Sequence, residues 1–412
     1  RLAYDEFFAH QLTLAIARKS KKTSTGLAST SIGSFVKKLI ISLSFSPTDA
    51  QIRAKDEIID DISKPIKMNR LLQGDVCCGK TLVAVMAMLE CVEAGGQAAF
   101  MAPSEILARQ HFETLSTMLK DFQLNIKILT GRDRGAQREE LLSELKAGEI
   151  DILIGTHALF QLDVIYHKLR LCIIDEQHRF GVQQRMELSA KGKAADILIM
   201  SATPIPRSLS LAQYGDMDLS IIDEKPIGRK PIKTVLVSSN RINEIVGRIQ
   251  KAIQDNKQIY WVCPLISESE VLNLTSAEDR FLFLKEHLGE DLVGIIHGQQ
   301  KSTEKDTTME RFLSGDIKVL VATTVIEVGV DVPNASIMVI EHAERFGLAQ
   351  LHQLRGRVGR GSIESSCLLL FDNSISKAAK DRLSVLRETE DGFLIAEKDL
   401  KTRGGGDLIG LE

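Results

Sequence analysis

The chain has 412 residues, of which 44% are hydrophobic and 26% charged, and it contains no repeat or low-complexity tract. This length and composition predict two or three globular domains with ample cores and exclude a largely disordered chain. The formal net charge of −3 excludes a global basic footprint, so any nucleic acid must be held by a local groove.

The first apolar run, Leu39-Ile40-Ile41, is far too short to span a bilayer, and the start of the chain has no signal-peptide layout. The six cysteines show no metal-ligand spacing and imply no disulfide framework. We therefore expect a cytoplasmic protein with reduced thiols and no contact with a membrane.

Residues 1–34 are expected to form an N-terminal helix followed by a linker rich in Ser, Thr and Gly. A second helix is expected over residues 46–61. Thr48 and Gln51 fit the N-cap and N3 positions of a capping box at its start.

A phosphate-binding loop is predicted between an apolar strand at residues 71–72 and a helix over residues 81–94. The pattern G-x-x-x-x-G-K-[ST] is matched by Gly74, Gly79, Lys80 and Thr81. Backbone N–H groups of the loop would hold phosphates, Lys80 would neutralise them, and the Thr81 hydroxyl would bind Mg²⁺. The alternative is a glycine-rich turn that leads into a helix.

After this loop, short apolar runs alternate with amphipathic segments of helical length. The runs are residues 98–101, 126–129, 151–155, 171–175 and 197–201. This alternation predicts a doubly wound domain with a parallel sheet covered on both faces, which we place at residues 35–226.

A polar, proline-containing passage at residues 223–231 interrupts the pattern, and we expect a domain boundary there. Further strand-like runs are residues 234–237, 259–263, 293–297, 319–322, 337–341 and 367–371. They predict a second α/β domain at residues 227–373 without a phosphate loop of its own. Residues 374–412 are expected to form a truncated helical hairpin.

Asp175 and Glu176 follow an apolar strand, and the carboxyl end of a parallel strand faces the ligand crevice. Asp175 would bind Mg²⁺ through water, and Glu176 would act as a base or orient the attacking water. The alternative is an acidic turn that caps the next helix. The spacing from Lys80 and the presence of His178 favour a functional role.

Arg357 and Arg360 lie three residues apart among glycines. Guanidinium groups with this spacing can reach the γ-phosphate of a nucleotide across a cleft, as an arginine finger does. The alternative is a basic helix end on the surface. We expect a catalytic site that is completed when ATP closes the cleft between the two domains.

Taken together, these segments resemble a superfamily-2 helicase core, and specifically the RecG-type branched-DNA helicases. The matching motifs are residues 72–81, 102–108, 154–157, 175–178, 201–203, 321–333 and 353–360. The resemblance covers residues 35–412 and implies two tandem RecA-like parallel-sheet domains, a P-loop NTPase helicase core, with a C-terminal helical hairpin.

The resemblance also implies roles for individual residues. Residues assigned to ATP are Gln51, Gly74, Asp75, Val76, Cys77, Cys78, Gly79, Lys80, Thr81, Gly329, Asp331 and Gln353, with Lys80, Asp175, Glu176, Arg357 and Arg360 as the catalytic set. Residues assigned to DNA are Pro103, Ser104, Gly155, Thr156, His297, Gly298 and Thr323. Residues assigned to coupling are His178, Ser201, Thr203, Arg207 and Arg403.

The sequence departs from the family pattern at several positions. Cys77-Cys78 replaces Gly-Ser in the phosphate loop, where a glycine can be required for a positive φ. Gln299-Gln300 replaces Arg-Met after His297-Gly298, which is expected to weaken a contact with DNA phosphate. The N-terminal wedge domain of the family is absent from these 412 residues, so we expect a motor that steps on DNA without unwinding branches.

The leading hypothesis is an ATP- and Mg²⁺-dependent DNA helicase or double-stranded DNA translocase that remodels replication forks and Holliday junctions in recombination and repair. The expected partners are branched or double-stranded DNA and a single-strand-binding protein, and the expected state is a monomer. One alternative is a hydrolysis-impaired module that clamps DNA, suggested by Cys77-Cys78. Another, an RNA helicase, is disfavoured by the hairpin.

Overall fold

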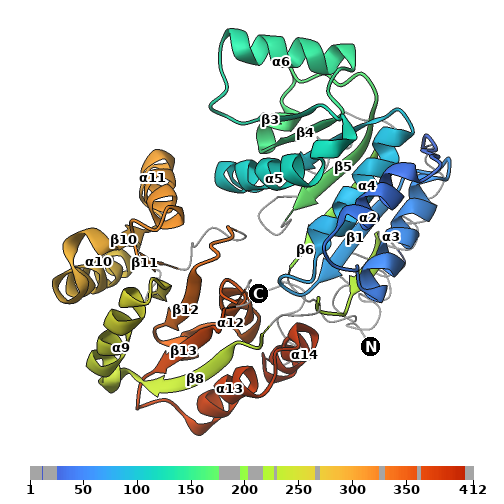
Figure 1. Cartoon of the computed structure of the whole chain (residues 1–412). Coiled ribbons are helices and arrows are strands. Elements are labelled where there is room, and N and C mark those ends of the chain that lie inside the picture. Colours follow the sequence, from blue (N-terminus) through green and yellow to red (C-terminus); the bar gives the residue numbers. More distant parts are fainter. Residues whose placement is uncertain are drawn as a thin grey trace. The chain divides into compact units, whose positions relative to one another are not determined.

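The computed structural model describes residue 12 and residues 26–175, 195–202, 217–226, 230–264, 270–323, 330–359 and 363–403 (Figure 1). Two compact units divide the chain after Pro226. The helix expected near the N-terminus lies outside the described residues, apart from Leu12.

The first unit is built on a seven-stranded sheet in the order β3-β4-β2-β5-β6-β1-β7. Every strand pair in it is parallel. The strands are β1 (Asn69–Gly74), β2 (Gln97–Met101), β3 (Ile126–Leu129), β4 (Ile152–Gly155), β5 (Leu169–Asp175), β6 (Asp196–Ser201) and β7 (Asp218–Ile222). The parallel sheet predicted from the alternating pattern is confirmed, whereas β7 was not anticipated.

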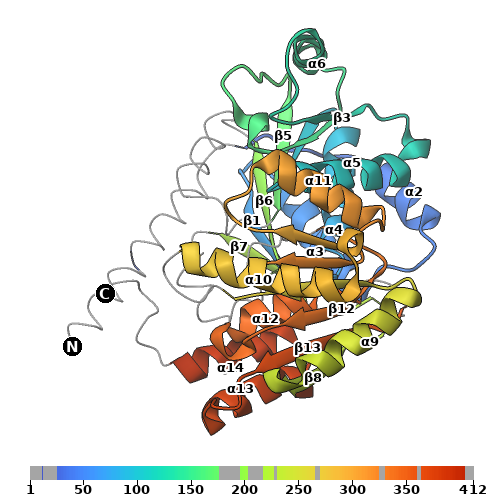
Figure 2. The same cartoon turned by 90° about the vertical axis from the view of Figure 1, so that its left-hand side faces the viewer.

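Helices cover both faces of this sheet (Figures 1 and 2). They are α2 (Ser34–Ser42), α3 (Asp49–Ile62), α4 (Lys80–Glu93), α5 (Glu105–Met118) and α6 (Ala136–Ala147), with short 3-10 turns at Lys120–Phe122 and His157–Phe160. Ala99 and Met101 belong to the core cluster that includes Leu145 of α6. Phe100, which points to the opposite face, packs against α5 through His111.

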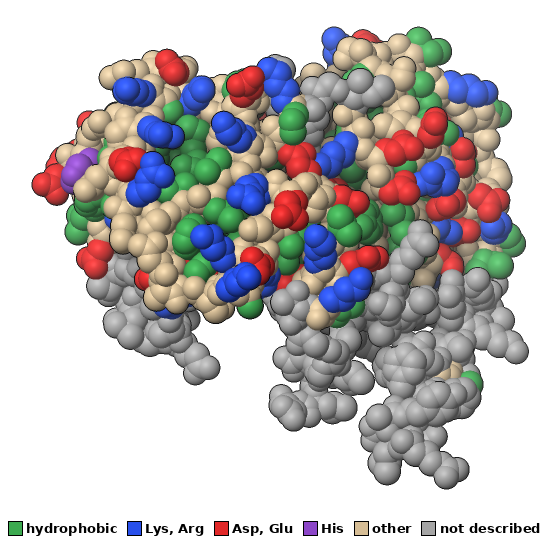
Figure 3. Space-filling view, turned by 90° about the horizontal axis from the view of Figure 1, so that it is seen from below, with side chains coloured by type: hydrophobic (Ala, Val, Ile, Leu, Met, Phe, Trp, Pro, Cys, Tyr) green, Lys and Arg blue, Asp and Glu red, His purple; other side chains and the backbone are tan. Residues whose placement is uncertain are grey.

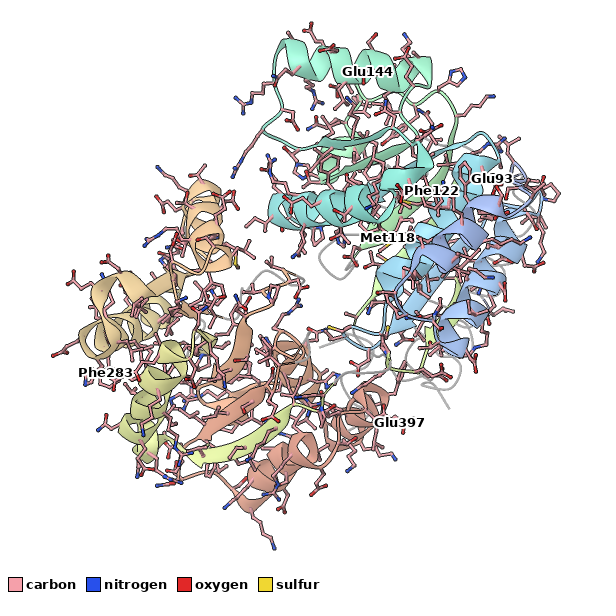
Figure 4. The ribbon with its side chains drawn as sticks, in the orientation of Figure 1. Glu93, Met118, Phe122, Glu144, Phe283 and Glu397 are labelled. Carbon is pink, nitrogen blue, oxygen red and sulfur yellow. The ribbon has the colours of Figure 1, made fainter. Side chains whose placement is uncertain are left out.

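Helix α2 was not predicted, and side chains at its start attach it to the unit. Their partners Glu93 and Phe122 are labelled in Figure 4. Glu93, at the end of α4, accepts hydrogen bonds from the Ser31 hydroxyl at 2.9 Å and from the Ser34 backbone N–H at 3.0 Å. Phe35 meets Phe122 edge to face with ring centroids 5.8 Å apart. These contacts hold a short helix that has little intrinsic stability of its own.

The second unit contains a six-stranded sheet in the order β10-β11-β9-β12-β13-β8, again with all pairs parallel. The strands are β8 (Lys233–Ser238), β9 (Gln258–Val262), β10 (Val293–Ile296), β11 (Val319–Ala322), β12 (Ala335–Ile340) and β13 (Ser366–Phe371). All six coincide within one or two residues with the predicted strands.

The central strand β9 shows how the second sheet is covered. Trp261 belongs to a core cluster with residues of α9 (Ile242–Gln254) and α10 (Glu270–Leu288). Tyr260 points to the other face and packs against Phe312 of α11 (Ser302–Leu313), with ring centroids 5.0 Å apart. Short 3-10 turns lie at Ser239–Arg241, Glu290–Leu292 and Ala343–Arg345.

Three more helices complete the second unit: α12 (Leu348–Arg355), α13 (Lys377–Glu388) and α14 (Gly392–Arg403). Arg355, at the end of α12, donates to the carbonyls of Leu386 at 2.5 Å and Thr389 at 3.0 Å. The Asp399 carboxylate of α14 accepts from the N–H of Leu348 at 3.4 Å. The predicted pair of C-terminal helices is therefore present and is bonded to both ends of α12.

Candidate functional site

The predicted phosphate loop joins the end of β1 at Gly74 to the start of α4 at Lys80. The Lys80 ammonium is buried within the loop and donates to the carbonyls of Gly74 and Asp75, each at 2.9 Å. The loop thus holds the Lys80 ammonium in place through its own carbonyls. A bound phosphate would replace these carbonyls as the hydrogen-bond acceptors of Lys80.

Two glycines in this loop are required by close packing. Gly79 has a φ of +87°, and a Cβ built there would lie 2.2 Å from the Gln51 amide nitrogen. A Cβ on Gly74 would lie 2.4 Å from the Cys78 sulfur. Real Cβ atoms do not approach other atoms this closely, so a side chain at Gly74 or Gly79 would force Cys78 or Gln51 to move, and at Gly79 it would also be strained by the positive φ.

Gln51 connects helix α3 to the loop. Its Nε2 donates to the Cys78 carbonyl at 2.8 Å, and its Oε1 accepts from the Thr48 N–H at 3.0 Å. The Thr48 side chain accepts in return from the Gln51 N–H, so the predicted capping box is confirmed. The expected helix start at residue 46 was wrong, because this cap fixes the first helical residue at Asp49. Adenine contact by Gln51 remains a prediction.

Cys77, which replaces a glycine of the family pattern, adopts the positive φ for which a glycine can be required. Cys77 has a φ of +61°, a left-handed conformation that L-residues adopt at a cost. Cys78 is fully buried 3.9 Å from the Lys80 ammonium. Burial raises the pKa of the Cys78 thiol, so it is held as a neutral packing group.

Three motif residues converge at the carboxyl edge of the first sheet. Strand β6 lies between β1 and β5, with Ser201 paired to Gln73 and Met200 paired to Asp175. Asp175, Ser201 and the loop that follows Gly74 therefore leave neighbouring strands at the same end. The Asp175 carboxylate is 13% exposed and lies 3.2 Å from Nε2 of His111.

A second cluster of predicted site residues lies at the same edge of the sheet, where β2 and β4 end. The N–H of Ala102 donates to the Gly155 carbonyl at 2.8 Å, which brings the segment containing Pro103 and Ser104 next to Gly155 and Thr156. The Ser104 hydroxyl caps α5 by accepting from the N–H of Leu107 at 3.4 Å. The Thr156 hydroxyl is buried and has no hydrogen-bond partner among the residues that the structure describes.

The second sheet has a similar polar edge where β10 and β11 end. Ile296 is paired with Ala322, and the N–H of Thr323 donates to the Ile296 carbonyl at 3.3 Å. The segment of His297 and Gly298 therefore lies beside Thr323. Within the described parts of the chain, neither Nδ1 of His297 nor the Thr323 hydroxyl has a partner, and burial lowers the pKa of His297.

Comparison with known proteins assigns both units to helicase families. Residues 48–211 match the model of the DEAD/DEAH box helicase family, and residues 238–362 match that of the helicase conserved C-terminal domain. A curated "ATP-dependent DNA helicase RecG" from Pasteurella multocida is 46% identical over 415 residues, covering all of this chain and 60% of that protein. This chain carries a helicase core of the RecG type.

The structural comparison agrees. A solved structure described as RecG bound to a three-way DNA junction is 45% identical and superposes with a TM-score of 0.88, covering 99% of this chain and 54% of that one. The RecG of Thermotoga maritima is 48% identical, and this chain covers 53% of it. Dbp5 of S. cerevisiae, at 18% identity and a TM-score of 0.61, shares the fold. The predicted tandem RecA-like architecture is confirmed.

The chain spans between 50% and 60% of the length of the RecG proteins that it matches. Among the described residues, no helix has the length and apolar character needed to cross a membrane. These relatives give no support to the alternative of a hydrolysis-impaired DNA clamp.

The arginine motif of the RecG-type core leads out of α12. Arg357 is 4% exposed, its N–H donates to the Leu354 carbonyl at 3.0 Å, and Gln353 lies one helical turn earlier. Gly359 has a φ of +74° and lies against Ile232. Asp331 lies in the segment just before β12. The nucleotide roles of these residues stay predictions.

Several predicted residues of the RecG-type core lie outside the described residues. They are Glu176, His178, Thr203, Arg207, Gly329 and Arg360. Arg403 is the last residue of α14, and its coupling role, like that of Ser201, is untested.

Sequence inspection missed two features of the site. Gln300, which was expected to affect a DNA contact, bonds the loop itself: its Oε1 accepts from the His297 N–H at 3.1 Å and its Nε2 donates to the Ile295 carbonyl at 3.2 Å. His111 was not considered, although it lies seven residues after Ser104. That spacing is two helical turns, which places it on the same face of α5 as the predicted DNA contact.

Proposed function

We propose that this chain is the ATP-driven motor of a RecG-type DNA helicase, a double-stranded DNA translocase that remodels replication forks and Holliday junctions in recombination and repair. The observation that carries the proposal is the polar edge of the first sheet, where the Lys80 loop, Ser201 and Asp175 leave neighbouring strands together. The names of the RecG relatives support this interpretation.

The residues at this edge fit an ATP–Mg²⁺ complex. Asp175 supplies a carboxylate at a strand end, and Thr81 supplies a hydroxyl in the first turn of α4. No group of three or more potential metal-ligating side chains occurs in the part of the chain that the structure describes. A magnesium ion that is held by few protein ligands, water and phosphate needs no such group, and it would neutralise charge on the transferred phosphoryl group.

The chain's own groups would act by exchanging partners. Lys80 would move its hydrogen bonds from the Gly74 and Asp75 carbonyls to phosphate oxygens. The backbone N–H groups at the start of α4 would add to this cradle. Asp175 would orient the water ligands of the metal.

DNA would be held by small groups instead of a basic surface. Figure 3 shows Lys and Arg side chains interspersed with Asp and Glu over one face of the molecule. The hydroxyls of Thr156 and Thr323 and Nδ1 of His297 are buried and lack partners among the described residues, and a DNA phosphate that displaced the atoms covering them would supply acceptors. Contacts of this type position a protein on DNA without a large net positive charge.

Other parts of the proposal concern organisation and partners. The chain divides after Pro226, and this division supports residues 35–226 and 227–373 as the two helicase domains. The helices α13 and α14, bonded to α12, support a duplex substrate over RNA because they match the predicted coupling hairpin. A cytoplasmic location, a monomeric state and a single-strand-binding protein partner stay predictions.

Phosphate release from ATP tests the proposal. The chain should hydrolyse ATP faster with forked or linear duplex DNA than without nucleic acid, and single-stranded RNA should have little effect. Stimulation by RNA alone would make the chain an RNA helicase. Binding of DNA with no hydrolysis under any condition would contradict a motor.

A further inference from the structure

His111 connects two parts of the first unit that the proposed function treats separately. It lies in the middle of α5, which begins after Ser104 and ends at Met118. Met118 is labelled in Figure 4. Its Nε2 lies 3.2 Å from Oδ2 of Asp175, and both side chains are 13% exposed. One helix therefore carries a predicted DNA contact at its start and a direct contact with the predicted magnesium ligand two turns later.

The chemistry of the two groups indicates which of them donates the hydrogen bond between His111 and Asp175. An ionised carboxylate only accepts hydrogen bonds, so Nε2 of His111 must be the donor to Asp175. The imidazole is held from its side by Phe100, with ring centroids 4.7 Å apart, and Phe100 is fully buried in β2. A ring fixed by packing restrains the Asp175 carboxylate more firmly than a mobile donor would.

A single helix connects Ser104 to His111. The Ser104 hydroxyl closes the first turn of α5 through the N–H of Leu107. From Ser104 to His111 the helix rises about 10 Å, at 1.5 Å per residue. A displacement of the start of α5 by a bound phosphate therefore moves His111 with it, because a helix transmits such shifts as a unit.

We propose that His111 is a positioning residue that orients Asp175 for the nucleotide-bound metal and couples DNA contact at the start of α5 to that carboxylate. This inference deepens the proposed function and rests on it. The plain structural alternative is that His111 only packs on Phe100 and fills space beneath the edge of the sheet.

Two substitutions separate these roles. His111→Phe keeps an aromatic ring against Phe100 but removes the donor to Asp175, whereas His111→Gln keeps an N–H donor at similar reach and loses the ring. His167→Phe, at an exposed histidine of the same unit, is the matched control. Thermal unfolding of all variants identifies any that fail to fold.

The first readout is equilibrium binding of a fluorescent ATP analogue during a Mg²⁺ titration, which requires no turnover. His111→Phe should raise the Mg²⁺ concentration at half-saturation about 10-fold, the usual cost of losing a partner that orients a metal ligand. His111→Gln should recover most of this loss. Binding without Mg²⁺ should match that of the unsubstituted chain.

The second readout is the change in that Mg²⁺ midpoint when forked duplex DNA is added. The unsubstituted chain and the control should show a DNA-dependent shift, and His111→Phe should lose most of it. If His111→Phe keeps the unsubstituted midpoint, or if His111→Gln is as impaired as His111→Phe, the positioning role is wrong. Absence of DNA-stimulated hydrolysis in the unsubstituted chain would instead refute the proposed function, since the Mg²⁺ titration does not depend on it.

Discussion

The phosphate loop of the first unit and the β10–β11 edge of the second differ in how their polar groups are satisfied. In the loop, Lys80 bonds two carbonyls and Gln51 bonds a third. At the other edge, Nδ1 of His297 and the Thr323 hydroxyl find no partner among the described residues. The polar groups of the loop are thus satisfied, whereas two buried polar groups at the second edge are not satisfied by the residues that the structure describes.

The difference shows two ways of preparing a site for phosphate. A buried ammonium without partners would cost several kcal/mol, so the loop keeps Lys80 bonded until a better acceptor arrives. A single buried hydroxyl costs about 1–3 kcal/mol, which a fold can tolerate at a few positions. If the proposed function holds, the loop would bind phosphate by exchange of hydrogen-bond partners, and the second edge would bind it by forming additional hydrogen bonds.

The largest expected effect is the loss of ATP turnover when the Lys80 ammonium is removed. Lys80→Ala should lower DNA-stimulated ATP turnover by about 10²- to 10³-fold, because it removes an electrostatic donor from the transferred phosphate. Phosphate release measures this loss. Lys64→Ala, at an exposed lysine that pairs with Asp60, should leave turnover unchanged. Equal turnover in both variants would mean that Lys80 serves only to close the loop.

The next effect tests the unpartnered hydroxyls. Thr156→Val and Thr323→Val should each weaken binding of duplex DNA about 10- to 100-fold, the worth of a hydrogen bond to a charged group. Neither should lower thermal stability, because the hydroxyl that is removed has no partner in the described structure.

Thr130→Val is the matched control for this pair, because the Thr130 hydroxyl is buried and bonds the Asp133 carboxylate at 3.0 Å. It should lower stability by about 1 kcal/mol and leave DNA binding unchanged. A reversed result, with stability lost at Thr156 and Thr323 and DNA affinity intact, would show that these hydroxyls are structural.

A third effect concerns pH at the opposite end of the first sheet. Desolvation raises the pKa of Asp196 to about 7, and its carboxylate accepts from the Met68 N–H at 2.7 Å. The folded chain binds this proton more tightly than the unfolded chain, so stability should fall as pH rises from about 4 to about 7 and then level off. Asp196→Asn keeps the acceptor without the charge.

That variant should match the unsubstituted chain in stability near pH 4 and exceed it at pH 8 by on the order of 4 kcal/mol, because the pKa of Asp196 is raised from 3.8 to about 7. Denaturant unfolding at the two pH values measures the difference. ATP turnover should be unaffected, because Asp196 starts β6 and the site lies at the other end of that strand. If the difference in stability between the two proteins were the same at both pH values, Asp196 would not be the cause of the pH dependence.

The smallest effect concerns strain in the loop. Cys77→Gly should stabilise the first unit by about 0.5–1 kcal/mol, since the relief of a positive φ exceeds the entropy cost of glycine. This corresponds to a rise in Tm of about 1–4 °C. Cys77→Ala retains the strained Cβ and should show no gain. Equal Tm values for the two variants would show that the conformation carries no cost.

Much of the fold was predictable from the sequence because buried parallel strands are continuous apolar runs. All strands of the second sheet were located in this way, and the phosphate loop was found from four residues. The pattern fails where tertiary contacts decide. Strand β7 has partly exposed positions at the edge of its sheet, and α2 is held by Glu93, which lies 59 residues from Ser34.

The candidate site was predictable only as far as local motifs extend. Ser201 and Asp175 were located because strand ends meet at one edge of a parallel sheet. His111 and Gln300 act through contacts that depend on helix orientation and loop closure. The residues next to them in the sequence do not indicate that His111 contacts the Asp175 carboxylate or that Gln300 bonds the backbone of residues 295–297.

The affinity for forked duplex DNA in different nucleotide states tests the central claim most directly. A motor driven by ATP must bind DNA differently with a non-hydrolysable ATP analogue, with ADP and without nucleotide, because coupling of two sites is a difference in binding free energy. We expect the dissociation constants to differ by at least about 5-fold among these states. Equal affinity in all three would contradict the account.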